Sequence, residues 1–370
     1  MAQVLNDILN CCYTESKYRK QYSNFQKMLE ANQEHLFDDS NYLEKLKQES
    51  EEIRKERIKL QTANIERKRI DRSLARQEFY YEYIGSVCES LPLPEFRPLH
   101  IPQCSNPKEY LCCLSDLHYG ASFKSENNEY SPEIFKQRLS YLGDNLVAFI
   151  EEKNLSKISI ACLGDTLQGI LRLSDLQLND STVVKSTVEV CRLIASFLNE
   201  LSTYVKVDYY HVPTANHTQI RPLGSKANEL GNEDLEYLIG NYISDLCLMN
   251  DRITIHLPEE GKGYSVVDIN GFEVIAMHGH NIRNIDTAVR DLSMMRRSFI
   301  DYLILGHFHG GREISSHEGL LHDTEVLVCP SFIGSDPYSD TIMKGSKAAA
   351  KIYGFDTCYG HTETYKIILN

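Results

Sequence analysis

Two histidines one residue apart, His307 and His309, follow a short apolar run at residues 303–305 and a glycine. Such a run is typical of a buried strand. Alternate residues of an extended segment point the same way, so both imidazoles can reach one pocket at the end of that strand. Imidazole is the commonest neutral metal ligand near pH 7. Ordinary surface or core histidines explain this pair equally well, so the rest of the chain decides between the two interpretations.

Four more apolar runs are followed by side chains that bind metals. These side chains are Asp116 and His118 after residues 110–114, Asp165 after residues 158–163, Asn216 and His217 after residues 205–212, and His278 after residues 272–277. Because α/β sheets place their sites at strand ends, all five sets can meet. Carboxylate, imidazole and amide groups without thiolate argue against a structural zinc site. Two ions about 3.5–4 Å apart, bridged by one carboxylate, would use all of these ligands.

The order of these groups, D-x-H, G-D, N-H, H and G-H-x-H, resembles the calcineurin-like metallophosphoesterase family from about residue 110 to the end. The segment Ser115–Gly120 is most similar to the SbcD-type branch, the manganese-dependent nucleases of DNA double-strand-break repair, with their bacterial and phage relatives. The resemblance implies an α/β fold. This fold is the four-layer αββα metallophosphoesterase sandwich of two packed mixed sheets, preceded here by an N-terminal helical extension.

The resemblance also implies a role for each motif residue. Asp116, His118 and His309 would hold a first metal ion, Asn216, His278 and His307 would hold a second, and Asp165 would bridge the two. His217 would lie over the scissile phosphate as general acid or leaving-group stabiliser. Two divalent ions are therefore expected. Manganese is favoured by the resemblance, whereas the mixture of hard oxygens and imidazoles also suits Fe or Zn²⁺ and leaves Mg²⁺ open.

Two positions depart from the family pattern, which is glycine-asparagine-histidine followed by an acid. Ala215 precedes Asn216, and Thr218 follows His217. An ordinary backbone conformation at Ala215 would make the missing glycine unimportant. The missing acid matters more, because that carboxylate would orient His217, and its loss could shift the substrate or the pH optimum.

Three further residues are weaker predictions of substrate contacts. His280 lies two residues beyond His278 and could touch a phosphate. Arg221 and Lys226 follow His217 in a polar loop and could donate charge-assisted hydrogen bonds to phosphate oxygens. Solvated loop residues without a role are the simpler interpretation of all three.

The loop after residues 326–329 carries two aromatic residues, Phe332 and Tyr338. Either could stack on a base, although packing at the edge of the sandwich is the simpler interpretation. Two more histidines, His211 and His317, are interpreted as ordinary.

The length of 370 residues suits one large catalytic domain with an appendage. Residues 1–90 are polar and predicted helical, and residues 41–83 contain neither glycine nor proline. Several prolines make residues 91–105 an extended, stiff linker. Residues 106–370, in which strand-like runs alternate with helical patterns, form the predicted metallophosphoesterase domain.

The helical region is basic between Arg54 and Arg76, although the whole protein is acidic. Such a helix could bind a nucleic-acid backbone. A solvated helix that packs on the next domain, or that pairs with a second copy in a homo-oligomer, is the favoured interpretation. The apolar residues Leu46, Ile53 and Leu60 recur every seven residues, which is too thin a stripe to define a coiled coil.

The formal net charge of −13 predicts poor non-specific DNA binding unless positive charge is local or is supplied by metal ions. The 11 cysteines include no C-x-x-C spacing, and several lie in apolar runs, which indicates a reducing, cytoplasmic compartment. We expect no signal peptide and no membrane partner, because no apolar run is long enough to span a bilayer.

The sequence thus predicts an enzyme, a metal-dependent phosphoric ester hydrolase, and favours a DNA nuclease. A phosphodiesterase or phosphomonoesterase for a small nucleotide, or a protein phosphatase, is the alternative that the acidic net charge favours. A scaffold with a vestigial site is disfavoured, because buried carboxylates and histidines without metal are costly. DNA, a second copy of the chain and an SbcC-type ATPase are the expected partners.

Overall fold

The computed structural model describes residues 2–33, 40–89, 108–169, 177–220, 233–259, 261–341 and 345–370. The chain divides into two units, residues 1–85 and residues 86–370, and each unit is described by itself. The predicted linker at residues 91–105 lies outside the described residues.

The first unit is helical, and its described residues contain no strand. Its helices are α1 (Ala2–Leu9), α2 (Glu15–Ala31) and most of α4 (Ser40–Glu89). Good helix formers dominate α4, and Pro is absent from it. The apolar side chains of Ile53 and Leu60 are 68% and 63% exposed. This part of α4 is therefore a solvated helix within its own unit.

The second unit contains two sheets, and the larger has the strand order β13–β12–β1–β4–β5–β6. Its strands are β1 (Glu109–Leu114), β4 (Lys157–Cys162), β5 (Lys206–His211), β6 (Ile253–His256), β12 (Ala349–Asp356) and β13 (Gly360–Ile368). The strands β1, β4, β5 and β6 run parallel, whereas β12 and β13 are antiparallel additions. The parallel arrangement brings the carboxyl ends of β1, β4 and β5 to one edge.

The second sheet has the strand order β10–β11–β9–β8–β7. Its strands are β7 (Ser265–Ile269), β8 (Phe272–Met277), β9 (Tyr302–Leu305), β10 (Arg312–His317) and β11 (Thr324–Val328). The strands β8, β9 and β11 are parallel. Asn270 and Gly271 form the turn between β7 and β8 with φ angles of 52° and 82°. An asparagine-glycine pair suits this hairpin, since the turn needs positive φ at both positions.

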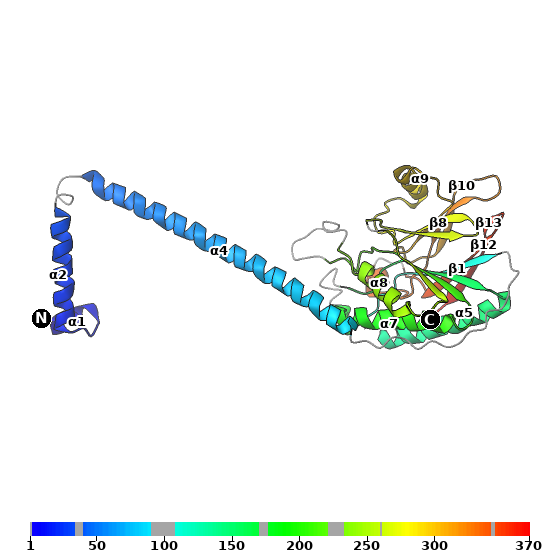
Figure 1. Ribbon diagram of the computed structural model, residues 1–370, viewed down its shortest axis with the longest axis horizontal. Coiled ribbons are helices and arrows are strands. Elements are labelled where there is room, and N and C mark those ends of the chain that lie inside the picture. Colours follow the sequence, from blue (N-terminus) through cyan, green and yellow to red (C-terminus); the bar gives the residue numbers. More distant parts are fainter. Residues whose placement is uncertain are drawn as a thin grey trace. The chain divides into compact units, whose positions relative to one another are not determined.

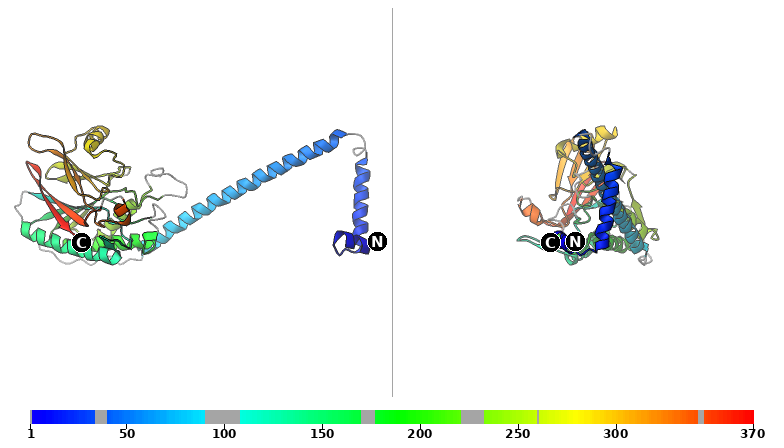
Figure 2. Two further views of the ribbon diagram at one scale, coloured as in Figure 1. Left: turned by 180° about the vertical axis from the view of Figure 1, so that it is seen from behind. Right: turned by 90° about the vertical axis from the view of Figure 1, so that its left-hand side faces the viewer.

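The remaining elements are helices and one short hairpin. They are β2 (Phe123–Lys124), β3 (Glu129–Tyr130), α5 (Pro132–Lys153), α7 (Val183–Leu201), α8 (Leu235–Cys247), α9 (Ile285–Arg296) and α10 (Pro337–Thr341). Ser131 caps α5 by accepting a hydrogen bond from the Ile134 N–H, and Pro132 occupies the first turn. Figure 1 shows α5 and α7 on one side of the sheets and α9 on the other, and Figure 2 shows the same layers from behind.

Strand alternation divides the buried side chains into three separate cores. On β1, Cys112 and Leu114 pack with residues of α5, α7 and α8. The other face of β1, with Leu111 and Cys113, packs against the second sheet. The far face of that sheet, which includes Leu303, packs with α9. The first core thus lies between the helices and the larger sheet, the second between the two sheets, and the third between the second sheet and α9. These four layers confirm the predicted αββα sandwich.

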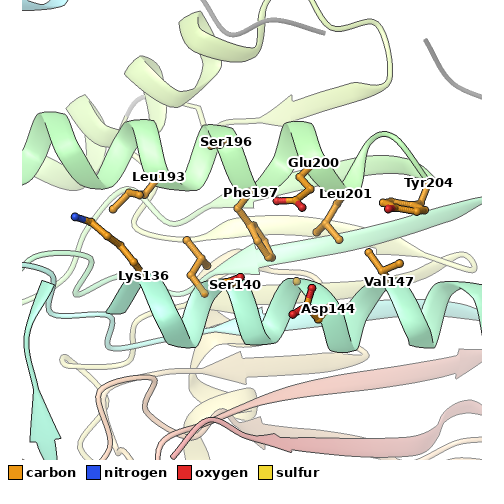
Figure 3. A pocket seen from close by; sticks show the side chains of 12 residues that line it. Lys136, Ser140, Asp144, Val147, Leu193, Ser196, Phe197, Glu200, Leu201 and Tyr204 are labelled. Carbon is orange, nitrogen blue, oxygen red and sulfur yellow. The ribbon is translucent and has the colours of Figure 1, made fainter. Parts of the chain in front are cut away.

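The outer helical layer contains a groove of about 260 Å³ between α5 and α7 (Figure 3). Its floor is apolar, with Leu139 and Phe197, and Lys136 and Glu200 are among the polar residues that line it. The groove lies on the helical face of the larger sheet, and none of the predicted site residues lines it.

None of the helices in the described part of the chain combines the length and the apolar character needed to cross a membrane.

Candidate metal centre

The predicted site residues lie in five loops that follow β1, β4, β5, β8 and β9, so both sheets contribute to the site. Backbone hydrogen bonds continue from the larger sheet into these loops. The Asp116 N–H donates to the Gly164 carbonyl at 3.1 Å, and the His118 N–H donates to the Asp165 carbonyl at 2.8 Å. The loops after β1 and β4 therefore leave the sheet side by side.

Among the described residues, three groups of side chains have ligand atoms close enough together to hold a metal ion. The groups are Asp116 with His118 and His309, His118 with Asp165 and His217, and Asp165 with His278 and His307, each within 4.8 Å. Asn216 joins the third group, because its Oδ1 lies 2.8 Å from the His278 Nε2. The structure thus brings together all seven side chains predicted as ligands, together with His217.

Asp165 lies between the other groups. Its Oδ2 is 3.0 Å from the His278 Nε2 and 4.0 Å from the His118 Nε2. Its Oδ1 accepts a hydrogen bond from the His217 backbone N–H at 2.8 Å. One carboxylate therefore faces both halves of the cluster.

Several buried polar atoms of the cluster have no hydrogen-bond partner. They are the Oδ1 of Asp116 and both ring nitrogens of His118. The two residues are 0% and 1% exposed. A buried polar atom without a partner costs roughly 1–3 kcal/mol, and a cation would satisfy an anionic oxygen and an imidazole lone pair. The donor set and these atoms therefore fit a divalent metal ion.

The backbone of the cluster is held in the left-handed region, which non-glycine residues rarely adopt. The φ angles are 54° at Asp116, 46° at His118, 49° at Asp165, 64° at His307 and 56° at His309. Each such residue costs on the order of 1–3 kcal/mol, and such residues concentrate at functional sites. With this backbone conformation, side chains from different loops converge on one centre.

Two glycines allow the loops to approach one another. A Cβ on Gly306 would overlap the Ser115 hydroxyl, so a larger residue at that position would force the ends of β9 and β1 to adjust. Gly164 has a φ of 87°, and a Cβ there would lie 2.8 Å from the Ala215 Cβ. Ala215 itself lies outside the left-handed region, so replacing the usual glycine imposes no backbone strain there.

Backbone carbonyls orient two of the histidines. The His278 Nδ1 lies 2.8 Å from the Leu163 carbonyl, and the His217 Nδ1 lies 3.0 Å from the Gln168 carbonyl. Because a carbonyl only accepts, each Nδ1 carries the hydrogen and each Nε2 faces the cluster. The Gln168 carbonyl thus orients the His217 ring, which is followed by Thr218 rather than by an acid.

Neighbouring charges and burial act on the pKa values of the cluster, and they lower some of these values and raise others. Burial raises the pKa of Asp116 and Asp165, but the facing His309 and His278 outweigh it, and both pKa values lie below their usual range. Burial lowers the pKa of His278, but Asp165 raises it to about 9. Burial and the neighbouring His217 lower the pKa of His118 to about 4.

Of the weaker predictions, His280 is among the described residues, and it lies beside the cluster. Its ring centroid is 5.6 Å from that of His278 and 6.4 Å from that of His307. Arg221 and Lys226 lie outside the described residues. Their contacts with a substrate therefore remain predictions from the sequence.

Phe332 does not lie at the rim of the site. Its side chain is 0% exposed and packs 5.3 Å from the Phe135 ring, so base stacking by Phe332 is wrong and interior packing is correct. Its loop nevertheless supports the site, because the Phe332 N–H donates to the Ser115 carbonyl at 2.8 Å. The side chain of Tyr338 lies outside the described residues.

Sequence reasoning did not single out Gln168 or Glu236. Gln168 acts through its backbone carbonyl, and because every residue has one, the sequence cannot indicate this role. Glu236 lies on α8, away from every motif, and contacts the residue that follows Asp165. An acidic residue placed in the buried stripe of a predicted helix was the one available signal.

Fold and site together define a four-layer αββα protein with a histidine- and aspartate-rich cluster that can hold metal ions at its strand ends. Residues 1–37 match the family described as the YonJ N-terminal domain. The chain is 36% identical over 364 residues to the SPbeta prophage-derived uncharacterized protein YonJ of Bacillus subtilis (strain 168), covering 96% of this chain and 88% of that protein. The chain belongs to the YonJ family.

Solved structures with some likeness include proteins titled as phosphoesterases. Vps29 of Entamoeba histolytica complexed with zinc has a TM-score of 0.28 at 14% identity and covers 70% of this chain and 99% of its own. A predicted phosphoesterase of Streptococcus pneumoniae TIGR4 has a TM-score of 0.29 at 10% identity, covering 71% and 99%. The calcineurin-like phosphoesterase YfkN of Bacillus subtilis has a TM-score of 0.31 at 10% identity, covering 70% and 90%. At such scores the fold assignment rests on the chain's own strand order and cores, and membership of the SbcD-type branch stays a prediction.

Proposed function

We propose that this protein is a two-metal-dependent phosphoesterase that hydrolyses phosphodiester bonds. The observation that supports it most is the convergence of Asp116, His118, Asp165, Asn216, His278, His307 and His309 from five strand ends onto one cluster. The unpartnered buried atoms of Asp116 and His118 add support, because a cation would satisfy them.

In this proposal the two halves of the cluster hold one ion each. Asp116, His118 and His309 hold the first ion, Asn216, His278 and His307 hold the second, and Asp165 contacts both. Support for the bridge comes from the Asp165 Oδ2, which faces His278 at 3.0 Å and His118 at 4.0 Å. When bound, two divalent ions lower the pKa of a water molecule and neutralise charge on phosphoryl oxygens. We propose Mn²⁺ from the family resemblance, and the donor set would also accept Fe or Zn²⁺.

His217 would act on the leaving group. Its Nδ1 hydrogen is engaged by the Gln168 carbonyl, and its backbone N–H by Asp165, so the ring has a fixed orientation with the Nε2 toward the cluster. A protonated imidazole in this position can give a proton to a departing oxygen. The same ring lies close enough to His118 and Asp165 to bind a metal ion instead, and these two roles are separated by mutation below.

DNA is the proposed substrate. The basic part of α4, with residues such as Arg67 and Arg69, is exposed and could contact a phosphate backbone. A small nucleotide or a phosphoprotein is the second candidate, which the net charge of −13 favours.

The experiment uses the full-length protein, stripped of metal and refilled with Mn²⁺. A labelled single-stranded DNA, a labelled duplex and bis-p-nitrophenyl phosphate are incubated side by side. Asp165→Asn, purified identically, controls for a contaminating nuclease. DNA cleavage by the wild type alone supports the nuclease and shows its polarity. Turnover of the small diester with DNA intact moves the proposal to a nucleotide phosphodiesterase, and no turnover at all refutes it.

Partners and compartment are proposed on weaker grounds. A second copy could cover the exposed apolar residues of α4, such as Ile53 and Leu60, and an ATPase of the SbcC type would follow from the resemblance. A cytoplasmic location is supported by the described cysteines, which are all free thiols. Sizing of the full-length protein by light scattering tests the homo-oligomer.

A further inference from the structure

A buried acid and a buried histidine face one another behind the cluster. Glu236 lies in the first turn of α8 and His211 ends β5, and the two are 0% and 1% exposed. The Glu236 Oε2 is 2.8 Å from the His211 Nε2. The other ring nitrogen of His211 lies 2.9 Å from the Tyr209 hydroxyl. The orientation of the histidine ring is therefore fixed on both sides.

Glu236 also holds the residue that follows Asp165. The Thr166 backbone N–H donates to the Glu236 Oε1 at 2.8 Å, and the Thr166 hydroxyl donates to the Oε2 at 2.8 Å. One carboxylate thus accepts hydrogen bonds from both donors of Thr166, and its contact with His211 fixes the orientation of that carboxylate. The φ of 49° at Asp165 requires the backbone there to be held from outside, and these two bonds hold it at the next residue.

The same turn of α8 holds the loop that carries Asn216. The Oδ2 of Asp234, the N-cap of α8, accepts from the Ala215 N–H at 2.9 Å. The Leu235 N–H donates to the Thr218 carbonyl at 3.1 Å. The start of α8 therefore fixes both loops that supply the bridging carboxylate and its neighbour.

A stability role alone does not explain this arrangement. Buried ion pairs can often be replaced by apolar residues without loss of stability, so their presence is weak evidence for a stabilising role. Here both carboxylate oxygens accept hydrogen bonds from the residue next to Asp165, and one of them also contacts His211. Groups that orient ligands in this way commonly change metal affinity when they are removed.

We propose that Glu236, oriented by His211, is a positioning residue that fixes Asp165 between the two halves of the cluster and so sets the affinity for both metal ions. The inference rests on the proposed function, since it requires that the cluster binds metal. It predicts that changes at Glu236 or Thr166 weaken metal binding although neither side chain reaches the cluster.

The test is calorimetric titration of Mn²⁺ into the metal-stripped full-length protein. Glu236→Gln keeps an oxygen for the Thr166 N–H but loses the charge, and Thr166→Val loses only the hydroxyl, with its contacts to Glu236 and Cys162. Each is expected to bind Mn²⁺ about 10-fold more weakly or worse, as is typical when such supporting contacts are lost. Glu200→Gln, a matched change at an exposed position of α7, should bind like the wild type.

Thermal unfolding of each metal-free variant separates positioning from stability. A purely structural role would lower the unfolding temperature while folded protein kept wild-type Mn²⁺ affinity, and that result in Thr166→Val would overturn the inference. If Glu236→Gln fails to fold, the Thr166→Val titration alone decides. A wild-type protein that binds no Mn²⁺ would instead refute the proposed function, so the two failures are distinguishable.

Discussion

Replacing the bridging carboxylate by its amide, Asp165→Asn, tests the centre of the proposed site. The substitution keeps the shape of the side chain and an oxygen to accept the His217 N–H. It removes the negative charge that lies 3.0 Å from the His278 Nε2 and 4.0 Å from the His118 Nε2. Because that charge faces both halves of the cluster, both Mn²⁺ ions should bind more weakly in the variant.

The metal-free protein gives a magnitude for the lost charge. The pKa of His278 is raised from 6.5 to about 9, against the effect of burial and mainly by Asp165. One pKa unit corresponds to about 1.4 kcal/mol, so the protonated imidazole stabilises the fold by up to about 3 kcal/mol. A raised histidine pKa gives stability that is full below pH 6.5 and is lost as the pH rises through about 9.

Asp165→Asn should therefore destabilise the metal-free protein most at pH 6 and least above pH 9. Urea unfolding of both proteins at pH 6 and pH 9.5 measures this difference, and Mn²⁺ calorimetry counts the ions bound at pH 7. Loss of only one ion would mean that Asp165 does not bridge. A destabilisation that is equal at both pH values would refute the electrostatic reasoning.

Three further predictions address the leaving group, the N-terminal helix and the packing of the loops. His217→Ala should retain two Mn²⁺ ions by calorimetry yet lose turnover on diesters with poor leaving groups; loss of an ion would make His217 a ligand instead. Deleting residues 1–90 should abolish salt-sensitive DNA binding in a gel-shift titration while bis-p-nitrophenyl phosphate turnover continues; unchanged DNA affinity would remove the helix from substrate binding. Gly306→Ala should lower stability by about 1–3 kcal/mol in thermal unfolding, because its methyl group overlaps the Ser115 hydroxyl. Gly143→Ala, whose Cβ would meet only the Phe197 ring at 3.7 Å, is the control, and an equal loss there would contradict the overlap.

The sequence predicted the strands that stand out as apolar runs and missed others, among them the edge strand β10 and the buried strand β12. The buried strands β1, β4 and β9 are nearly continuous apolar runs, as expected of parallel strands between layers. The edge strand β10 has the sequence REISSH and is mostly exposed, so neither its composition nor its alternation distinguishes it from a loop. Helix α5 stands out in the sequence, because Pro132 in its first turn and a stripe of apolar residues at helical spacing both indicate a helix.

In the site, too, the sequence indicated the features that depend on residue type and not those that depend on the folded surroundings. The cluster could be predicted because its side chains are chemically distinctive and follow recognisable strands. The support from Gln168 could not be predicted, since it comes from a main-chain carbonyl. The support from Glu236 depends on how the first turn of α8 meets the loop after β4, which only the folded chain reveals.

The left-handed backbone at five residues of the cluster has a consequence for variation in this protein. Glycine would adopt the φ of 56° at His309 without strain, so a change that removes this imidazole also relaxes the chain. Natural proteins sit near a stability threshold, and substitutions that stabilise them often cost function where the active site is strained. A glycine at position 309 would therefore relax the backbone and remove a candidate metal ligand at the same time, so stability and metal binding oppose one another at this residue.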